Sequence, residues 1–444
     1  MFTCIRMKNF KSFKNVTIDL SQKKNIAKPL AVIYGINGSG KTTITQAFLL
    51  LKRTIETMEI RGMLNDLLNE KITPLDDFPL KEDIMMKMIQ SNLSMNSIEK
   101  IIQSYKMVDT SDNMSLEYEF VINGSAGSYY IEFDNNSIVK ERLEFKLNQR
   151  RGCYFNLEDE EISINTKIFE SKEFYELIRN QVKMYWGKHS LLSILLFEMA
   201  DKSDTFVNSN ISNNLMKVIL LLTNIQYKMI NTQERTTNDS ILYNLQSGEI
   251  DKSEEKILDQ VEKILDGIFK TIFKDIVKVF YKKNLENDQI SYRLFLKKQI
   301  ENKIFNINFS LESSGTKEIL QLLPAFVAAA SGKFVIIDEY GSRIHDVLSA
   351  NLLESIVNQI QGQLILTTHN TMIMECSNLE KDSLYFIVDD KTLKKSVKCI
   401  TELEERLHPN YNYRTRYLTQ DMYKPSLPEI AGKIDLSGLV TLFN

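Results

Sequence analysis

The stretch from Gly35 to Thr42, Gly-Ile-Asn-Gly-Ser-Gly-Lys-Thr, has the most specific chemistry in the chain. It matches the pattern G-x-x-x-x-G-K-[ST] and lies between the apolar run PLAVIYG and a segment that we expect to be helical from about residue 41 to 57. In such a loop the backbone N–H groups surround phosphates, the lysine reaches the β and γ phosphates, and the hydroxyl after it ligates Mg²⁺. We therefore expect ATP and Mg²⁺ as cofactors. The residues predicted to bind ATP are Gly35, Asn37, Gly38, Ser39, Gly40, Lys41, Thr42 and Thr43.

Two further apolar runs end in polar residues that suit the same reaction. KFVIIDE, residues 333–339, predicts a buried strand that delivers Asp338 to the carboxyl edge of a sheet, where ligands collect in open α/β folds. Asp338 is expected to act with Thr42 in holding the metal, and Glu339 to polarise an attacking water. QLILTTHN, residues 363–370, predicts another strand that ends at His369, placed to sense the γ-phosphate. Glu339, Lys41 and His369 are the predicted catalytic residues.

A second candidate phosphate site lies at residues 313–317, Ser-Ser-Gly-Thr-Lys, before an apolar run that predicts a helix. Small polar residues at a helix start satisfy its free N–H groups, so the stretch has an ordinary role as a helix cap. A helix N-terminus with such donors also attracts anions. Because the chain already has one phosphate loop, we expect Ser313, Ser314, Gly315, Thr316 and Lys317 to act on a nucleotide held by another subunit.

The composition is that of an ordinary globular protein: 444 residues, 43% apolar, 25% charged and a net charge of −3. No overall basic field indicates a nucleic-acid binder, although local patches remain open. The four cysteines form no CxxC pair, which argues against a zinc site or a disulfide framework. The longest apolar runs are too short for a membrane span, so we expect a cytoplasmic protein with no membrane partner.

The order of the expected elements predicts an α/β fold. Strands with turn signals fill residues 115–165, and strands alternate with helices in the last third, which is typical of a largely parallel sheet. We divide the chain into residues 1–167, the first half of an ATPase head with a β-rich lobe; 168–288, a helical insertion acting as arm or lid; and 289–444, the second half of the head.

Within the insertion, apolar residues recur every three or four positions from 254 to 280, which predicts one long helix. Its end, KDIVKVFYKK, carries several lysines. Two interpretations stay open there: a solvated helix face, which we favour, or an arm that contacts DNA. The turn NFKSF, residues 9–13, is similarly open between packing its aromatic residues and lying near the nucleotide.

Together, NFKSF, GINGSGKT, ESSGTKE, FVIIDE, GSRIH and TTH resemble, in this order, the ABC-type ATPase heads of the RecF, SMC and OLD-like groups. The resemblance implies two heads that sandwich two ATP molecules, with Ser313, Ser314 and Gly315 acting in trans, Glu339 as general base and His369 as the switch histidine. The segment 341–345 then lies at the dimer contact. Gln90 is a weak candidate for the metal-contacting glutamine of these heads, and no Asp-x-Asp cluster of a TOPRIM nuclease follows His369.

A narrower resemblance covers nearly the whole chain, through segments such as LESSGTKEILQLLP, DEYGSRIH and NYRTRYLTQDMYKPSLPEI. These look like bacterial abortive-infection ATPases of the OLD-like group, relatives of the ATPases of the AbiL, Septu and PARIS anti-phage systems. The resemblance implies a homodimer or higher homo-oligomer that controls an effector protein, a nuclease or toxin, from the same operon. The alternatives are a RecF/SMC-like DNA-repair ATPase that binds nucleic acid directly, and an ATP-bound scaffold with negligible turnover.

Overall fold

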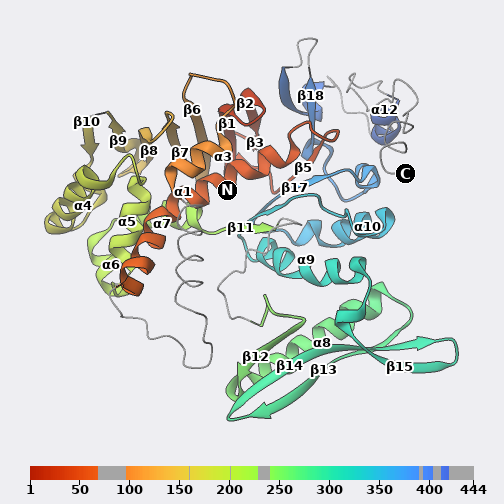
Figure 1. The fold of residues 1–444 in the computed structure, drawn as a ribbon. Helices are drawn as coiled ribbons and strands as arrows, with labels where there is room; N and C mark the ends of the chain where they lie inside the picture. The colour runs from red at the N-terminus through yellow and green to blue at the C-terminus, as the bar shows by residue number, and fades with distance from the viewer. Residues whose placement is uncertain are drawn as a thin grey trace, which may run out of the picture.

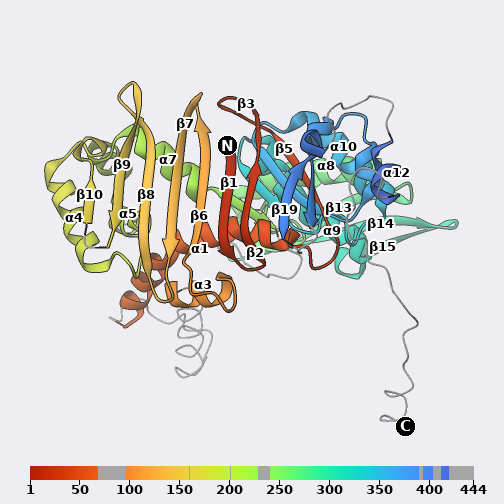
Figure 2. The ribbon, with the colours of Figure 1, turned by 90° about the horizontal axis from the view of Figure 1, so that it is seen from above.

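The computed structural model describes residues 1–68, 97–159, 161–200, 202–228, 241–389, 394–403 and 412–419. Gln90, the candidate metal-contacting glutamine, lies outside them. Two large sheets dominate the fold, one antiparallel and one largely parallel, and Figure 2 shows them side by side with α1 (Lys41–Leu68) beneath. The predicted α/β class is confirmed. No helix in the described ranges is long and apolar enough to cross a membrane.

The antiparallel sheet is built from alternating sequences in which every second residue is buried. β6 shows this clearly: Met114, Leu116, Tyr118 and Phe120 are buried while the residues between them are partly exposed. The Tyr118 hydroxyl donates to Ala47 O at 2.6 Å, so this sheet is tied to α1. The strand order is β10 (Glu161–Ile164), β9 (Arg150–Glu158), β8 (Ile138–Leu147), β7 (Ser125–Phe133), β6 (Met114–Ile122), β1 (Phe2–Phe10), β2 (Phe13–Asp19).

The second sheet holds short strands that are buried on both faces, as continuous apolar runs predict. Its strands are parallel except for β19 at one edge. The order is β11 (Ile225–Lys228), β16 (Phe334–Ile337), β17 (Gln363–Thr368), β5 (Leu30–Tyr34), β18 (Leu384–Asp389), β19 (Lys395–Cys399). A third, two-stranded ribbon is formed by β3 (Ser21–Lys23) and β4 (Ile26–Ala27).

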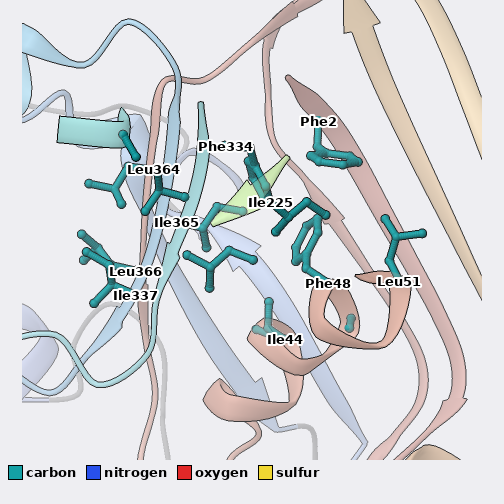
Figure 3. Packing of buried hydrophobic residues seen from close by; sticks show 14 of the residues in the cluster. Phe2, Ile44, Phe48, Leu51, Ile225, Phe334, Ile337, Leu364, Ile365 and Leu366 are labelled. Carbon is teal, nitrogen blue, oxygen red and sulfur yellow. The ribbon is translucent and has the colours of Figure 1, made fainter. Parts of the chain in front are cut away.

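An aromatic cluster joins the two large sheets through α1. Phe2 at the start of β1 lies with its ring centroid 4.7 Å from that of Phe334 on β16, and Phe48 of α1 packs on both, at 5.2 Å and 4.9 Å (Figure 3). The buried Gln363 side chain adds hydrogen bonds at the same junction, since it accepts from Phe2 N at 2.7 Å and donates to Phe2 O at 2.8 Å. The sheets therefore share one core.

Residues 168–288, expected to be a helical insertion, contain both helices and strands. Four helices cover the antiparallel sheet at its far end (Figure 1): α4 (Lys172–Tyr185), α5 (Leu191–Ala200), α6 (Asp204–Asn210) and α7 (Asn213–Thr223). β11 then joins the parallel sheet, beside β16. Apart from α8, described below, the remaining α-helices of the described chain are α3 (Ile98–Tyr105), α9 (Ser314–Ala330), α10 (Asp346–Ile356), α11 (Ile400–Leu403) and α12 (Tyr413–Leu418).

The long helix predicted for residues 254–280 is wrong beyond Ile272. The helix α8 (Glu255–Ile272) ends there, and Ile276 and Val279 belong to the strand β13 (Ile276–Glu286). β13 forms a small sheet with β14 (Gln289–Ile300), β12 (Ser247–Asp251) and β15 (Lys303–Asn308). We call this sheet and α8 the arm. Figure 1 shows the arm extending away from the two large sheets, with α8 on the side of the strands that faces α9.

Candidate functional site

The phosphate loop opens at the carboxyl end of β5, in the middle of the parallel sheet. Tyr34, the last residue of β5, pairs with Thr368 of β17, so Gly35 and His369 follow at the same edge. Ile337 of β16 pairs with Leu366, which brings Asp338 to this edge as well. Strand register thus makes the phosphate loop a neighbour of two predicted site segments that lie about 300 residues later in the sequence.

The loop itself is tightly packed. Gly38 and Gly40 have φ values of +77° and +115°, which glycine adopts without a steric penalty. A Cβ at Gly40 would lie 2.6 Å from the ring of Phe13, in the N-terminal turn. The turn NFKSF therefore packs its aromatic residues Phe10 and Phe13, one of the two interpretations that its sequence left open, and it also lies against the phosphate loop.

Two groups in the loop fit a bound phosphate. The hydroxyl of Ser39 is buried and makes no hydrogen bond within the described structure, so an acceptor or donor from a ligand would satisfy it. Lys41 is buried as well, and its ammonium donates to Gly35 O at 2.7 Å and Ile36 O at 3.0 Å. Asn37 is exposed, while Thr42 is partly and Thr43 fully buried at the start of α1.

Electrostatics places the acidic pair and the histidine near Lys41. Burial lowers the pKa of Lys41 to about 8, while the charges of Glu339 and Asp338 act in the opposite direction. Partial burial and the positive charge of Lys41 lower the pKa of His369. Lys41 is therefore within electrostatic reach of each of the other three, and strand register brings all of them to one edge of the sheet. With Thr42 and Asp338 as oxygen ligands, the arrangement suits a Mg²⁺-bound polyphosphate.

Thr367 organises the acidic pair, a role that the sequence did not reveal. Its hydroxyl donates to Asp338 Oδ1 at 2.6 Å and accepts from Glu339 N at 2.9 Å. Asp338 is buried, whereas the Glu339 side chain is exposed. Glu339 has φ = +55°, in the left-handed region that a residue with a Cβ enters only with strain. The turn after β16 thus exposes the Glu339 side chain, and it does so with a strained backbone conformation at Glu339.

The serine-glycine motif forms the start of α9, as its capping residues predict. Ser313 is the N-cap, and its Oγ accepts from Thr316 N at 3.2 Å and contacts Thr316 Oγ1 at 2.8 Å. Ser313 and Ser314 are exposed, and Lys317 is partly buried. A Cβ at Gly315 would lie 2.8 Å from Arg343 O, in the segment 341–345. The motif and the loop after the acidic pair are therefore in direct contact.

Charged residues outside the predicted motifs connect this region to its surroundings. The Lys298 ammonium lies 3.1 Å from Glu312, next to the N-cap, and 3.3 Å from Asp275 at the base of the arm. On the other side of α9, the Lys228 ammonium lies 3.0 Å from the buried Glu318, and Lys228 O accepts from Asp338 N. Lys395 of β19 donates to Gly38 O at 2.8 Å. None of the three lysines belongs to a recognisable motif, because the role of each depends only on its partner in the fold.

The strained φ of Glu339 predicts that this residue lowers the free energy of unfolding. Replacing Glu339 with glycine removes the left-handed penalty, so we expect the free energy of unfolding to rise by about 1 kcal/mol. Urea denaturation of both proteins measures the change. Glu339→Ala is the matched control, because it removes the carboxylate but keeps a Cβ at the same φ. Equal stabilisation by alanine and glycine would contradict the strain argument.

Comparisons with known proteins agree with the position of the phosphate loop. Residues 4–52 match a family model described as an AAA domain. The solved structures found include the SMC head domain of Thermotoga maritima, at 13% identity and a TM-score of 0.36, with 90% of this chain and 98% of that chain covered. The SMC head domain of Pyrococcus furiosus bound to the C-terminal domain of ScpA gives the same identity and score, covering 90% and 97%. No curated protein matches. The family model described as "AAA domain, putative AbiEii toxin, Type IV TA system" matches residues 30–375, most of the chain, and the chain belongs to this family.

Proposed function

We propose that this protein is a Mg²⁺-dependent ATPase of the ABC type. The observation that carries the proposal is the strand register, which brings Asp338, Glu339 and His369 to the same sheet edge as a phosphate loop with an unsatisfied buried hydroxyl. In this assignment Lys41 and the loop N–H groups bind the phosphates, and Thr42 and Asp338 hold Mg²⁺, which neutralises charge on the phosphates when bound. Glu339, exposed beside the buried Asp338, accepts a proton from the attacking water.

We further propose that two copies close over two nucleotides, with Ser313–Lys317 of each copy facing the nucleotide of the other. The exposure of Ser313 and Ser314 supports this, because both residues are accessible to a second copy. The contact between Gly315 and Arg343 O supports a single surface made of the motif and the segment 341–345.

The biological role that we propose is the regulatory subunit of an anti-phage defence system, in which the ATP state holds or releases a separately encoded effector. The family description, a putative toxin of a TA system, supports a function that depends on a second component. Among the named defence systems, the OLD-like relatives AbiL, Septu and PARIS are the ones whose segments this sequence resembles.

Hydrolysis is tested by comparing Glu339→Gln with Lys41→Ala. Loss of the general base should reduce the turnover of ATP by about 100-fold or more with binding retained, because base catalysis contributes on that scale. Loss of the lysine should abolish binding itself. Phosphate release and nucleotide calorimetry separate the two effects. Turnover of Glu339→Gln equal to that of the native protein would favour the scaffold alternative.

The effector is tested with the same Glu339→Gln protein, expressed from its operon and purified with ATP. A co-purifying nuclease or toxin, absent when Lys41→Ala is the bait, is the expected result. Recovery of DNA in place of any protein would instead favour the repair-type alternative.

The pKa of Lys41 predicts how the affinity for ATP changes with pH. Free Lys41 loses its proton above about pH 8, whereas bound phosphates favour the charged form, so binding above pH 8 takes up a proton. The affinity for a slowly hydrolysed ATP analogue should therefore fall as the pH rises above 8, by up to about tenfold per pH unit. Calorimetry at several pH values measures this fall. In Lys41→Arg, which stays charged, the slope should disappear; a slope that persists there would assign it to another group.

The trans role of the serine-glycine motif is tested by Ser314→Arg. An arginine at this exposed position leaves the core unchanged but fills the surface that a second copy would approach. We expect ATP binding at native affinity, no ATP-dependent dimer on a sizing column, and loss of hydrolysis. Ser253→Arg, at an exposed serine in the turn between β12 and α8, is the control for adding an arginine. If Ser314→Arg hydrolyses ATP as fast as the native protein, the motif serves only as a helix cap.

A further inference from the structure

The arm carries an unusual arrangement on the face of its sheet that α8 does not cover. The antiparallel register of β13 and β14 places three pairs in successive rows: Lys278 opposite Lys297, Phe280 opposite Phe295, and Lys282 opposite Arg293. The rings of Phe280 and Phe295 are stacked, with centroids 5.9 Å apart and planes 27° apart. An aromatic pair is thus flanked on both sides by pairs of positive charges. We call these six residues the basic-aromatic face.

The alternation of the strands shows that this face is not part of the core of the arm. Val279 and Tyr281 on β13, and Leu294 and Leu296 on β14, are buried beneath α8, whose own buried residues include Leu258 and Leu265. Phe280 and Phe295 point the other way and are partly exposed, and Lys282 and Arg293 are exposed. Figure 1 shows the uncovered side of the sheet directed away from α9.

Neutralisation of the positive charges is incomplete. Lys278 lies 4.0 Å from Glu262 of α8, but within the described part of the chain no carboxylate comes within ion-pair distance of Lys282, Arg293 or Lys297. Two acidic groups lie beyond the Lys282–Arg293 row: Glu249 of β12 pairs with Ser291 in the next row, and Glu286 accepts a hydrogen bond from Asn284. The Lys282 ammonium instead lies 4.1 Å from the ring centroid of Phe295, a cation–π contact.

Such rows are unfavourable for the sheet on its own. Like charges directly opposite each other destabilise an antiparallel pair, and aromatic rings left in water lose the benefit of burial. Folding of the arm requires neither the paired positive charges nor the exposed rings, because the core of the arm lies on the other face of the sheet. The two features together match what a ligand with both negative charges and flat apolar groups would need.

We propose that the basic-aromatic face binds single-stranded nucleic acid. The four basic residues contact phosphates, and the rings of Phe280 and Phe295 stack with a base, which displaces the Lys282 ammonium from the ring toward the backbone of the strand. A single strand is favoured over a duplex because only unpaired bases offer a π-face to the rings. The rows of charges are four residues, or about 13 Å, apart along β13, so they contact phosphates on either side of the stacked base. This binding does not rest on the ATPase function proposed above.

The test measures fluorescence anisotropy of labelled oligo(dT), oligo(U) and a DNA duplex of the same length, with the full chain at several salt concentrations. The native protein should bind a single strand more tightly than the duplex, with an affinity that falls as salt rises. Lys282→Glu with Arg293→Glu should weaken this binding by at least about tenfold and reduce the salt dependence. Phe295→Leu, which keeps apolar volume but removes the ring, should weaken it about tenfold.

The control is the double variant Lys256→Glu with Lys263→Glu, which makes the same change of net charge at exposed lysines of α8. It should bind nearly as well as the native protein. Thermal unfolding establishes that each variant is folded, and Lys41→Ala, which should bind nucleic acid normally, separates this site from the nucleotide site. The proposal is overturned if the native protein binds neither single strand, if the duplex binds more tightly, or if the α8 variant loses as much affinity as the variant on the face.

Discussion

Burial of β5 on both faces is the constraint on which the candidate site depends. The five residues Leu30–Tyr34 are all buried, so the strand is stable only with neighbours on either side and layers above and below. Those neighbours, β17 and β18, come from the last quarter of the chain. Once β17 is beside β5, with β16 beyond it, their carboxyl ends must meet, and the phosphate loop opens next to Asp338 and His369. The position of the site therefore follows from the pairing of β17 and β18 with the buried strand β5.

The polar groups at this edge are held mainly by the backbone of the strands. Thr367 fixes the acidic pair with one hydroxyl, and Thr368 donates to Tyr340 O at 2.8 Å, which holds the next turn of the chain. Both threonines are fully buried, where an unpaired hydroxyl would be costly. They therefore restrict the loop after β16 to one path, and that path includes the strained φ of Glu339.

The sequence predicted those parts of the site that are defined locally. A phosphate loop needs glycines at fixed spacing, and an apolar run followed by acids or a histidine needs only a strand, so Lys41, Asp338 and His369 could be identified without the fold. The contacts of Lys298, Lys228 and Lys395 could not, because nothing near each lysine in sequence specifies its partner. The error at residues 273–280 has a different cause. Ile272, Ile276 and Val279 satisfy a helical period, but β-branched residues also favour strands, and pairing with β14 decided between the two.

The ion pairs of Lys298 connect the arm mechanically to the start of α9. Lys298 belongs to β14, and it joins the base of the arm to Glu312, whose side chain is 7% exposed and directly precedes the cap of α9. Gly315 in turn leaves no clearance against Arg343 O. A rotation of the arm would therefore act as a lever on the start of α9 and on the loop beside it, with Lys298 as the pivot. Force applied at the tip of the arm would reach the serine-glycine motif and the segment 341–345 through the side chains of Lys298 and Glu312.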